Sequence, residues 1–220
     1  MLCARVRSAP SAPGPAAQQA GGPYKRTTYP ICTGGTVVAV KYAGGVMTIT
    51  DTLISYGKFA RYKDVQRVFP LADGQAIVAA GGEHSDFQQL LHFLEELADE
   101  DFNRDDGYKL GAAEYYNYIR AVMYNHRSKM NPLWNDVVVG GLKDGKPFLG
   151  TVDLIGTQYE EDFLATGFGG YIVTPILRSR WQPGMDEGEA RALLEDCMRV
   201  LFYRHCTALN RVHLAKVAAD

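Results

Sequence analysis

The side chains that most often carry chemistry are dispersed along this chain. The cysteines are Cys3, Cys32, Cys197 and Cys206, and the histidines are His84, His92, His126, His205 and His213. Neither set contains a CxxC pair or the Cys/His spacing of a zinc site. We therefore expect no metal site and no disulfide framework, and we interpret the cysteines as reduced thiols in a cytoplasmic or nuclear compartment.

Two further patterns were weighed as binding sites. The acidic run over residues 95–106 has carboxylates for calcium but not the ligand spacing of an EF-hand, so a solvated helix end and loop is the interpretation we favour. The Gly-Gly pairs do not form the GxxxxGK[ST] motif that cradles phosphate. The sequence predicts no cofactor.

Composition limits the classes of partner. The chain has 220 residues, a net charge of −2 and 46% hydrophobic residues, which predicts one globular domain. A nearly neutral chain has no basic surface for nucleic acid or an anionic membrane. Charges or glycines interrupt every apolar stretch before the roughly 20 residues that a membrane span needs. We expect neither nucleic acid nor a membrane as a partner.

The N-terminal segment differs in composition from the rest. Residues 1–30 are mostly Ala, Pro, Gly, Gln, Arg and Ser, and no acidic residue precedes Asp51. An organelle transit peptide is one interpretation, but Pro10, Pro13 and Pro15 would break the amphipathic helix that it needs. We favour a disordered extension or propeptide, because so few apolar residues cannot offset the entropy of ordering.

The remainder alternates strands and amphipathic helices. Expected strands cover residues 36–42, 46–50, 65–68, 76–80, 134–142, 148–155 and 211–217. Gly44-Gly45 turns the first hairpin, and residues 143–146 turn a later one. We assign the first four strands to one sheet and the hairpin over 134–155 to a second.

Helices are expected at three places. A capping box at Ser85 to Gln88 starts the first, a second begins near Ala112 and ends before Pro132, and Asp186 with Glu189 caps a third. Buried hairpins separated by amphipathic helices predict an α+β fold with two sheets face to face and helices outside, a four-layer αββα sandwich.

The start of the first hairpin carries a family resemblance. Thr33-Gly34-Gly35-Thr36, with Lys41 and Asp51 downstream, resembles the processing junction of proteasome β subunits. The resemblance extends over residues 33–217, and the stretch Arg127–Asn135 is similar to one kind of eukaryotic β subunit. It implies the N-terminal nucleophile hydrolase fold, with residues 1–34 as an extension or propeptide and 35–220 as the β-type domain.

In that family the residue after the removed propeptide is a threonine whose own amine acts as base. The resemblance places Gly35 at this position, and glycine has no hydroxyl. It also implies that Asp51 retains a family aspartate, that Arg67 replaces a tunable lysine, and that His205 and Ala208 replace an aspartate and a serine. Gly82 would retain an oxyanion donor, and Thr166 would stand in place of a serine.

These changes predict a vestigial site and a subunit that is not an enzyme by itself. The implied role is a non-catalytic structural β subunit of the 20S proteasome, in a 28-subunit particle with other α and β subunits, in the cytoplasm and nucleus. An active subunit using Thr36 or Cys32 as a displaced nucleophile is the alternative, although strand alternation points the Thr36 hydroxyl away from the site. A free-standing amidohydrolase of the same fold is a third hypothesis.

Two further expectations concern the chain ends. Gly35 excludes self-cleavage, so the extension would persist or be trimmed by an active neighbour. The resemblance also implies a C-terminal arm beyond the last strand, which is expected to be missing here or to lie outside the given sequence.

Overall fold

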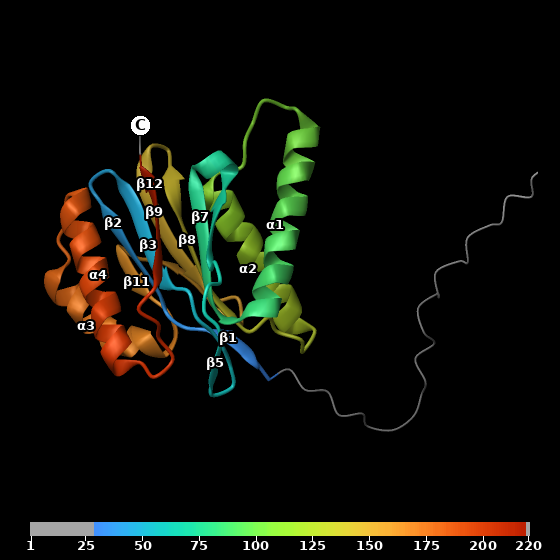
Figure 1. Cartoon of the computed structure of the whole chain (residues 1–220). Coiled ribbons are helices and arrows are strands. Elements are labelled where there is room, and N and C mark those ends of the chain that lie inside the picture. The colour runs from blue at the N-terminus through green and yellow to red at the C-terminus, as the bar shows by residue number, and fades with distance from the viewer. Residues whose placement is uncertain (1–28, 219–220) are drawn as a thin grey trace, which may run out of the picture.

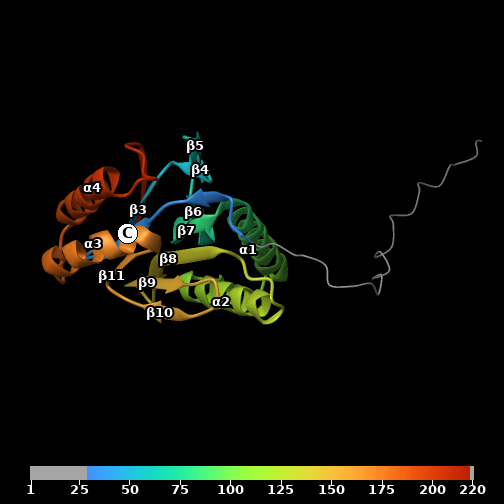
Figure 2. The same ribbon diagram turned by 90° about the horizontal axis from the view of Figure 1, so that it is seen from below.

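The structure is a computed structural model, and it describes residues 29–218. Two antiparallel sheets lie face to face, with helices α3 and α4 covering one outer face and α1 and α2 covering the other (Figure 1). The view from below shows the same four layers in section (Figure 2). This arrangement confirms the predicted α+β four-layer αββα sandwich.

The smaller sheet contains the two strands that lead to and from the candidate functional site described below. Its strand order is β11-β2-β3-β12. The bounds are Val37–Tyr42 for β2, Gly45–Asp51 for β3, Phe163–Ala165 for β11 and Val212–Ala218 for β12. The β2–β3 pair is the predicted first hairpin, in the register Tyr42↔Gly45 to Val37↔Thr50. The sheet therefore carries both the start of β2 and the end of β3.

The larger sheet has the order β10-β9-β8-β7-β1-β4-β5, with β6 also paired to β7. Its bounds are Cys32–Gly34 for β1, Ile54–Tyr56 for β4, Phe59–Tyr62 for β5, Val68–Leu71 for β6, Ala76–Glu83 for β7, Asn135–Lys143 for β8, Lys146–Val152 for β9 and Gln158–Glu160 for β10. A short 3-10 turn, Ala72–Gly74, joins β6 to β7.

The helices pack in pairs. Their bounds are His84–Arg104 for α1, Ala112–Ser128 for α2, Gly167–Arg180 for α3 and Glu187–Arg204 for α4. Apolar residues of α1 and α2, such as Leu94 and Ile119, pack on the larger sheet, and those of α3 and α4, such as Leu177 and Leu194, pack on the smaller one. A third apolar layer, with Val37 and Val138, fills the space between the sheets. None of these helices is long and apolar enough to span a bilayer.

The predicted division of strands between the sheets is wrong. Strand β6 pairs with β7, and β7 pairs with β8 in the larger sheet, not with β2 or β3. The seven-pair register from Ala76↔Gly141 to Gly82↔Asn135 joins segments that are far apart in sequence. Strands β3, β7 and β8 are buried along most of their length on both faces, so their apolar patterns do not distinguish one sheet from the other. Strand β6 also begins at Val68, where the predicted strand ended.

Two helix predictions differ from the structure. Helix α1 has Glu83 as its N-cap without a side-chain cap, and the Ser85 hydroxyl instead donates to the Glu83 carboxylate, so the capping box at Ser85 is wrong. Helix α3 was not predicted, because glycines in its first turn and Pro175 inside it read as turn signals. The capping box of Asp186 and Glu189 on α4 is confirmed, as is the start of α2 at Ala112.

The predicted N-terminal extension meets the folded part inside a strand. Its last residues, Cys32–Gly34, form β1, which lies between β4 and β7. The amides of Ile31 and Cys32 both donate to the Glu83 carboxylate. Residues 1–28, and with them most of the predicted disordered segment, lie outside the described residues.

Candidate functional site

The site lies where β1 passes into β2. Gly35 is the link between these strands, and a Cβ built on it would stand 3.5 Å from the Asp51 carboxylate oxygen Oδ1 and 3.8 Å from Cε1 of His205. Gly35, Thr36, Asp51, His205 and Ala208 line one hollow that has no room for a water molecule. The structure thus brings together residues that the sequence separates widely.

Arg67 closes the floor of this site. Its side chain is 1% exposed, and all five guanidinium N–H groups are within reach of an acceptor. Nη1 donates to the carbonyls of Gly35 at 2.9 Å and Ala80 at 3.2 Å, while Nε and Nη2 donate to the Asp51 carbonyl at 3.2 and 3.0 Å. Nη2 also forms an ion pair with the Asp51 carboxylate. Arg67 therefore ties the end of β3, the start of β2 and β7 together.

Burial and charge act against each other in this pair. Burial raises the pKa of the Asp51 carboxyl, and the Arg67 guanidinium and the Leu209 amide, which donates to Oδ2 at 3.1 Å, oppose that rise. Burial likewise lowers the pKa of Arg67, against the attraction of Asp51. We take the pair as ionised, because a guanidinium starts from so high a pKa that it keeps its proton. Burial also lowers the pKa of His205, while Asp51 opposes this change.

Thr36 projects in another direction from position 35. Its Oγ1 is buried without a hydrogen-bond partner among the described residues, and a Cβ added to Gly169 of α3 would lie 2.0 Å from it. Thr36 therefore packs against the helix layer, whereas position 35 addresses Asp51. This agrees with the side-chain alternation expected along the strand.

Thr166 and Gly82 complete the surroundings. The Thr166 hydroxyl accepts a hydrogen bond from the Val37 amide at 3.0 Å, so it fixes the first residue of β2. Gly82 has φ +91°, and a Cβ there would lie 2.0 Å from the Trp134 carbonyl oxygen. Only glycine fits this bend of β7. All seven sequence-predicted positions thus lie at or beside the β1–β2 junction.

Sequence reasoning missed two supporting residues. A Cβ on Gly34 would lie 2.8 Å from Cδ of Arg67, so the absence of a side chain at 34 leaves room for the arginine. Glu83 accepts the amides of residues 31 and 32 and so fixes the approach to the site. The Gly34-Gly35 doublet was a signal for the first of these, but nothing in the sequence pointed to Glu83.

The chemistry open to this arrangement is limited. Position 35 supplies neither a hydroxyl nor a thiol, and the cation beside it is a fully hydrogen-bonded guanidinium that cannot accept a proton. In residues 29–218, no cluster of three or more His, Cys, Asp or Glu is placed to hold a metal ion. The groups present can stabilise the junction of β1, β2, β3 and β7, where the Arg67 donors are all used.

Comparisons with known proteins agree with this geometry. The four-layer sandwich, with its site at the start of β2, is the fold of N-terminal nucleophile hydrolases. The family model described as "Proteasome subunit" matches residues 31–217, and the chain belongs to the proteasome subunit family.

Individual relatives sharpen the comparison. The chain is 45% identical to "Proteasome subunit beta type-4" of Arabidopsis thaliana over 89% of this chain and 79% of the relative. It is 43% identical to the protein of the same name from Dictyostelium discoideum, over 88% of this chain and 75% of the relative. It is also 36% identical to "Proteasome subunit beta type-7" of Saccharomyces cerevisiae, over 90% and 78%.

Proposed function

We propose that this chain is a non-catalytic β subunit of the 20S proteasome, of the kind called beta type-4 in plants and type-7 in yeast. The observation that carries the proposal is that Gly35 occupies the nucleophile position and that Arg67 donates a hydrogen bond to its carbonyl. A glycine stands at the nucleophile position, and the arginine donates to its carbonyl and to Asp51 instead of offering a neutral amine. The relatives named above support the subunit type.

The alternative nucleophiles gain little support. The Thr36 hydroxyl lies against Gly169, on the helix side of β2, and so away from Asp51. Cys32 lies within β1, where it pairs with Tyr56 of β4, so its use would require cleavage and rebuilding of this strand. We therefore propose that the chain contributes to protein degradation by assembly alone, in a particle of 28 subunits with other α and β subunits in the cytoplasm and nucleus.

A native mass spectrum of the tagged chain, purified from its own cells, tests this proposal. The expected result is a large particle with many different α and β partners. The mass of this subunit would also report how much of residues 1–34 remains. A free monomer or a small homo-oligomer would contradict the proposal and favour an independent enzyme of the same fold.

A further inference from the structure

The hairpin of β4 and β5 is a part of the surface that exposes several large apolar side chains. It forms the outer end of the larger sheet, and β5 is an edge strand whose four residues are all exposed. Figure 1 shows it projecting beyond the layers at the same end as β1. We call residues 54–63 the aromatic hairpin.

Three aromatic side chains share one face of this hairpin. Tyr56 pairs with Phe59, and Ile54 pairs with Tyr62, while the register shifts between Ile54 and Ser55. Directly opposed residues share a face, and so do residues two apart on a strand, such as 54 and 56. Phe59 and Tyr62, three apart, would lie on opposite faces of a regular strand, so the register shift is what brings them together.

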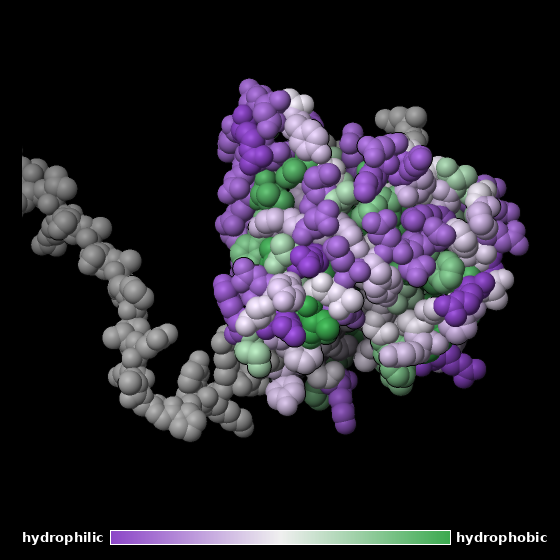
Figure 3. All heavy atoms as spheres, turned by 180° about the vertical axis from the view of Figure 1, so that it is seen from behind, coloured by the Kyte–Doolittle hydropathy of each residue, from purple (hydrophilic) through white to green (hydrophobic). Residues whose placement is uncertain are grey.

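These aromatic side chains are open to solvent in the isolated chain. The exposed fractions are 52% for Tyr56, 75% for Phe59 and 48% for Tyr62, and Ile31 beside them is 51% exposed. An aromatic side chain buries about 150–250 Å² when it is fully covered, and these three are about half exposed or more. The area that they still expose therefore supplies part of the roughly 800 Å² that one partner contributes to a standard interface. By contrast, the face shown in Figure 3 has its hydrophobic residues in small separate groups.

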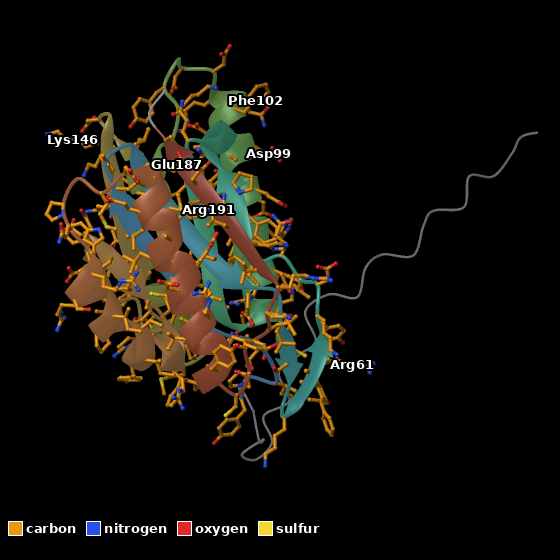
Figure 4. The ribbon with its side chains drawn as sticks, turned by 60° about the vertical axis from the view of Figure 1, so that its left-hand side comes forward. Arg61, Asp99, Phe102, Lys146, Glu187 and Arg191 are labelled. Atoms are coloured by element: carbon orange, nitrogen blue, oxygen red, sulfur yellow. The ribbon has the colours of Figure 1, made fainter. Side chains whose placement is uncertain are left out.

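The charged residues within the aromatic hairpin all have one sign. Lys58, Arg61 and Lys63 form no ion pair among the described residues, while the next residue, Asp64, pairs with Arg211 at 3.2 Å. Some exposed cations elsewhere pair within the chain, as Lys216 does with Glu187. The Arg61 guanidinium lies 5.8 Å from the Tyr62 ring centroid and points away from the fold (Figure 4).

We propose that the aromatic hairpin docks into a neighbouring subunit of the particle, in an apolar pocket with carboxylates at its rim. The aromatic face supplies the apolar anchor, and the three unpaired cations set the charge of the partner. This inference rests on the proposed function, because it names one contact through which the chain would assemble.

Two double variants test the contact in cells that express the tagged chain. Phe59→Ala with Tyr62→Ala removes the anchors, and Lys58→Glu with Arg61→Glu reverses the charge. We expect each to lower incorporation into the particle by roughly tenfold or more, since anchor residues contribute at least the 1.4 kcal/mol that a tenfold change represents. Native mass spectrometry of the purified particle measures the incorporated fraction.

Matched controls come from the opposite end of the molecule. Phe102 is 83% exposed on α1, and Lys146 is exposed at the start of β9, both far from Arg61 in Figure 4. Phe102→Ala and Lys146→Glu should incorporate like the unmodified chain. Hairpin variants that incorporate equally well would overturn the inference and leave the proposed function intact, whereas absence of the unmodified chain from any particle would overturn both.

A photocrosslinking experiment tests the contact without relying on how well the double variants fold. Phe59→p-benzoylphenylalanine in the assembled particle should crosslink to a different α or β subunit, at a surface with nearby Asp or Glu. Crosslinking to a substrate polypeptide, or to a second copy of this chain, would overturn the inference.

Discussion

Arg61 and Arg67 lie close in sequence but in opposite environments. Arg67 is 1% exposed, and its donors are used by Gly35, Asp51 and Ala80. Arg61 lies on the exposed edge strand β5 and has no ion pair among the described residues, only the ring of Tyr62 beside it. The guanidinium of Arg67 therefore has all its donors used within the chain, whereas that of Arg61 forms no ion pair among the described residues.

This difference indicates where the chain can act on other molecules. At the β1–β2 junction Arg67 and Asp51 satisfy each other, and the hollow there has no room for a water molecule. At the aromatic hairpin, the rings are about half exposed or more, and the three cations form no ion pair within residues 29–218. We interpret the former active-site region as a structural element and the hairpin as the place where a partner binds.

The largest expected effect comes from breaking the buried pair. Arg67→Met would remove the cation paired with the buried Asp51 carboxylate, which would keep the Leu209 amide as a donor, and would remove the donors to three carbonyls. We therefore expect a loss of about 3–5 kcal/mol in the free energy of unfolding. Arg61→Met, the matched change in the open region, should stay within about 0.5 kcal/mol. Denaturant unfolding of the two purified variants measures both, and equal losses would contradict the comparison.

Restoring a hydroxyl at the junction should affect stability less and create no activity. In Gly35→Thr the new Cβ fits at 3.5 Å or more from its neighbours, but the remaining atoms enter a hollow with no room for a water molecule. Overpacking of this kind typically costs about 1–3 kcal/mol. Because Arg67 stays protonated, we expect no covalent labelling of the new threonine by a peptide epoxyketone. Labelling at residue 35 would show that the surrounding groups still support catalysis.

The smallest expected effect is a pH dependence of stability that comes from two histidines near Arg67 and Asp51. Burial lowers the pKa of both His84 and His205 from the ordinary 6.5. Between the lowered pKa values and pH 6.5 the unfolded chain therefore binds more protons than the folded chain. The free energy of unfolding is greatest above about pH 6.5 and declines as the pH falls toward the lowered pKa values. Urea unfolding at several pH values between 5 and 7.5 measures the slope, with the range chosen about the histidine pKa.

A single variant checks the assignment of that slope. His84→Gln should flatten the pH dependence, while the exposed His92, which lies beside Glu95 and Glu96, provides the control His92→Gln. An unchanged slope in His84→Gln would rule out its part in the effect.

Local signals in the sequence predicted much of the fold. The first hairpin, the start of α2 at Ala112 and the Asp186 capping box were recognised because each depends on a few neighbouring residues. The turn of that hairpin is Ala43-Gly44, one residue before the predicted Gly44-Gly45, because Gly45 already pairs with Tyr42. The pairing of β7 with β8 depends on contacts between distant segments, and uniformly apolar strands do not encode it. The short strands β1, β4 and β5 were missed because three or four residues establish no clear alternation.

The candidate site could also be predicted only in part, because some of its contacts join distant segments. The family resemblance selected Gly35, Asp51 and Arg67, and the structure brings them into contact. It did not reveal that Arg67 would reach the Ala80 carbonyl or depend on the missing side chain at Gly34, because these contacts follow from how three strands meet. The charge and aromatic content of the hairpin were visible in the sequence, but their shared face required the register shift.

The central claim is that the junction at Gly35 performs no chemistry in the assembled particle. The most direct test is to treat intact particles with a peptide epoxyketone, which reacts with N-terminal threonines, and to measure the mass of every subunit. We predict that this chain keeps its unmodified mass while other β subunits gain the mass of the probe. A modified chain, with the adduct mapped to Thr36 or Cys32, would contradict the account.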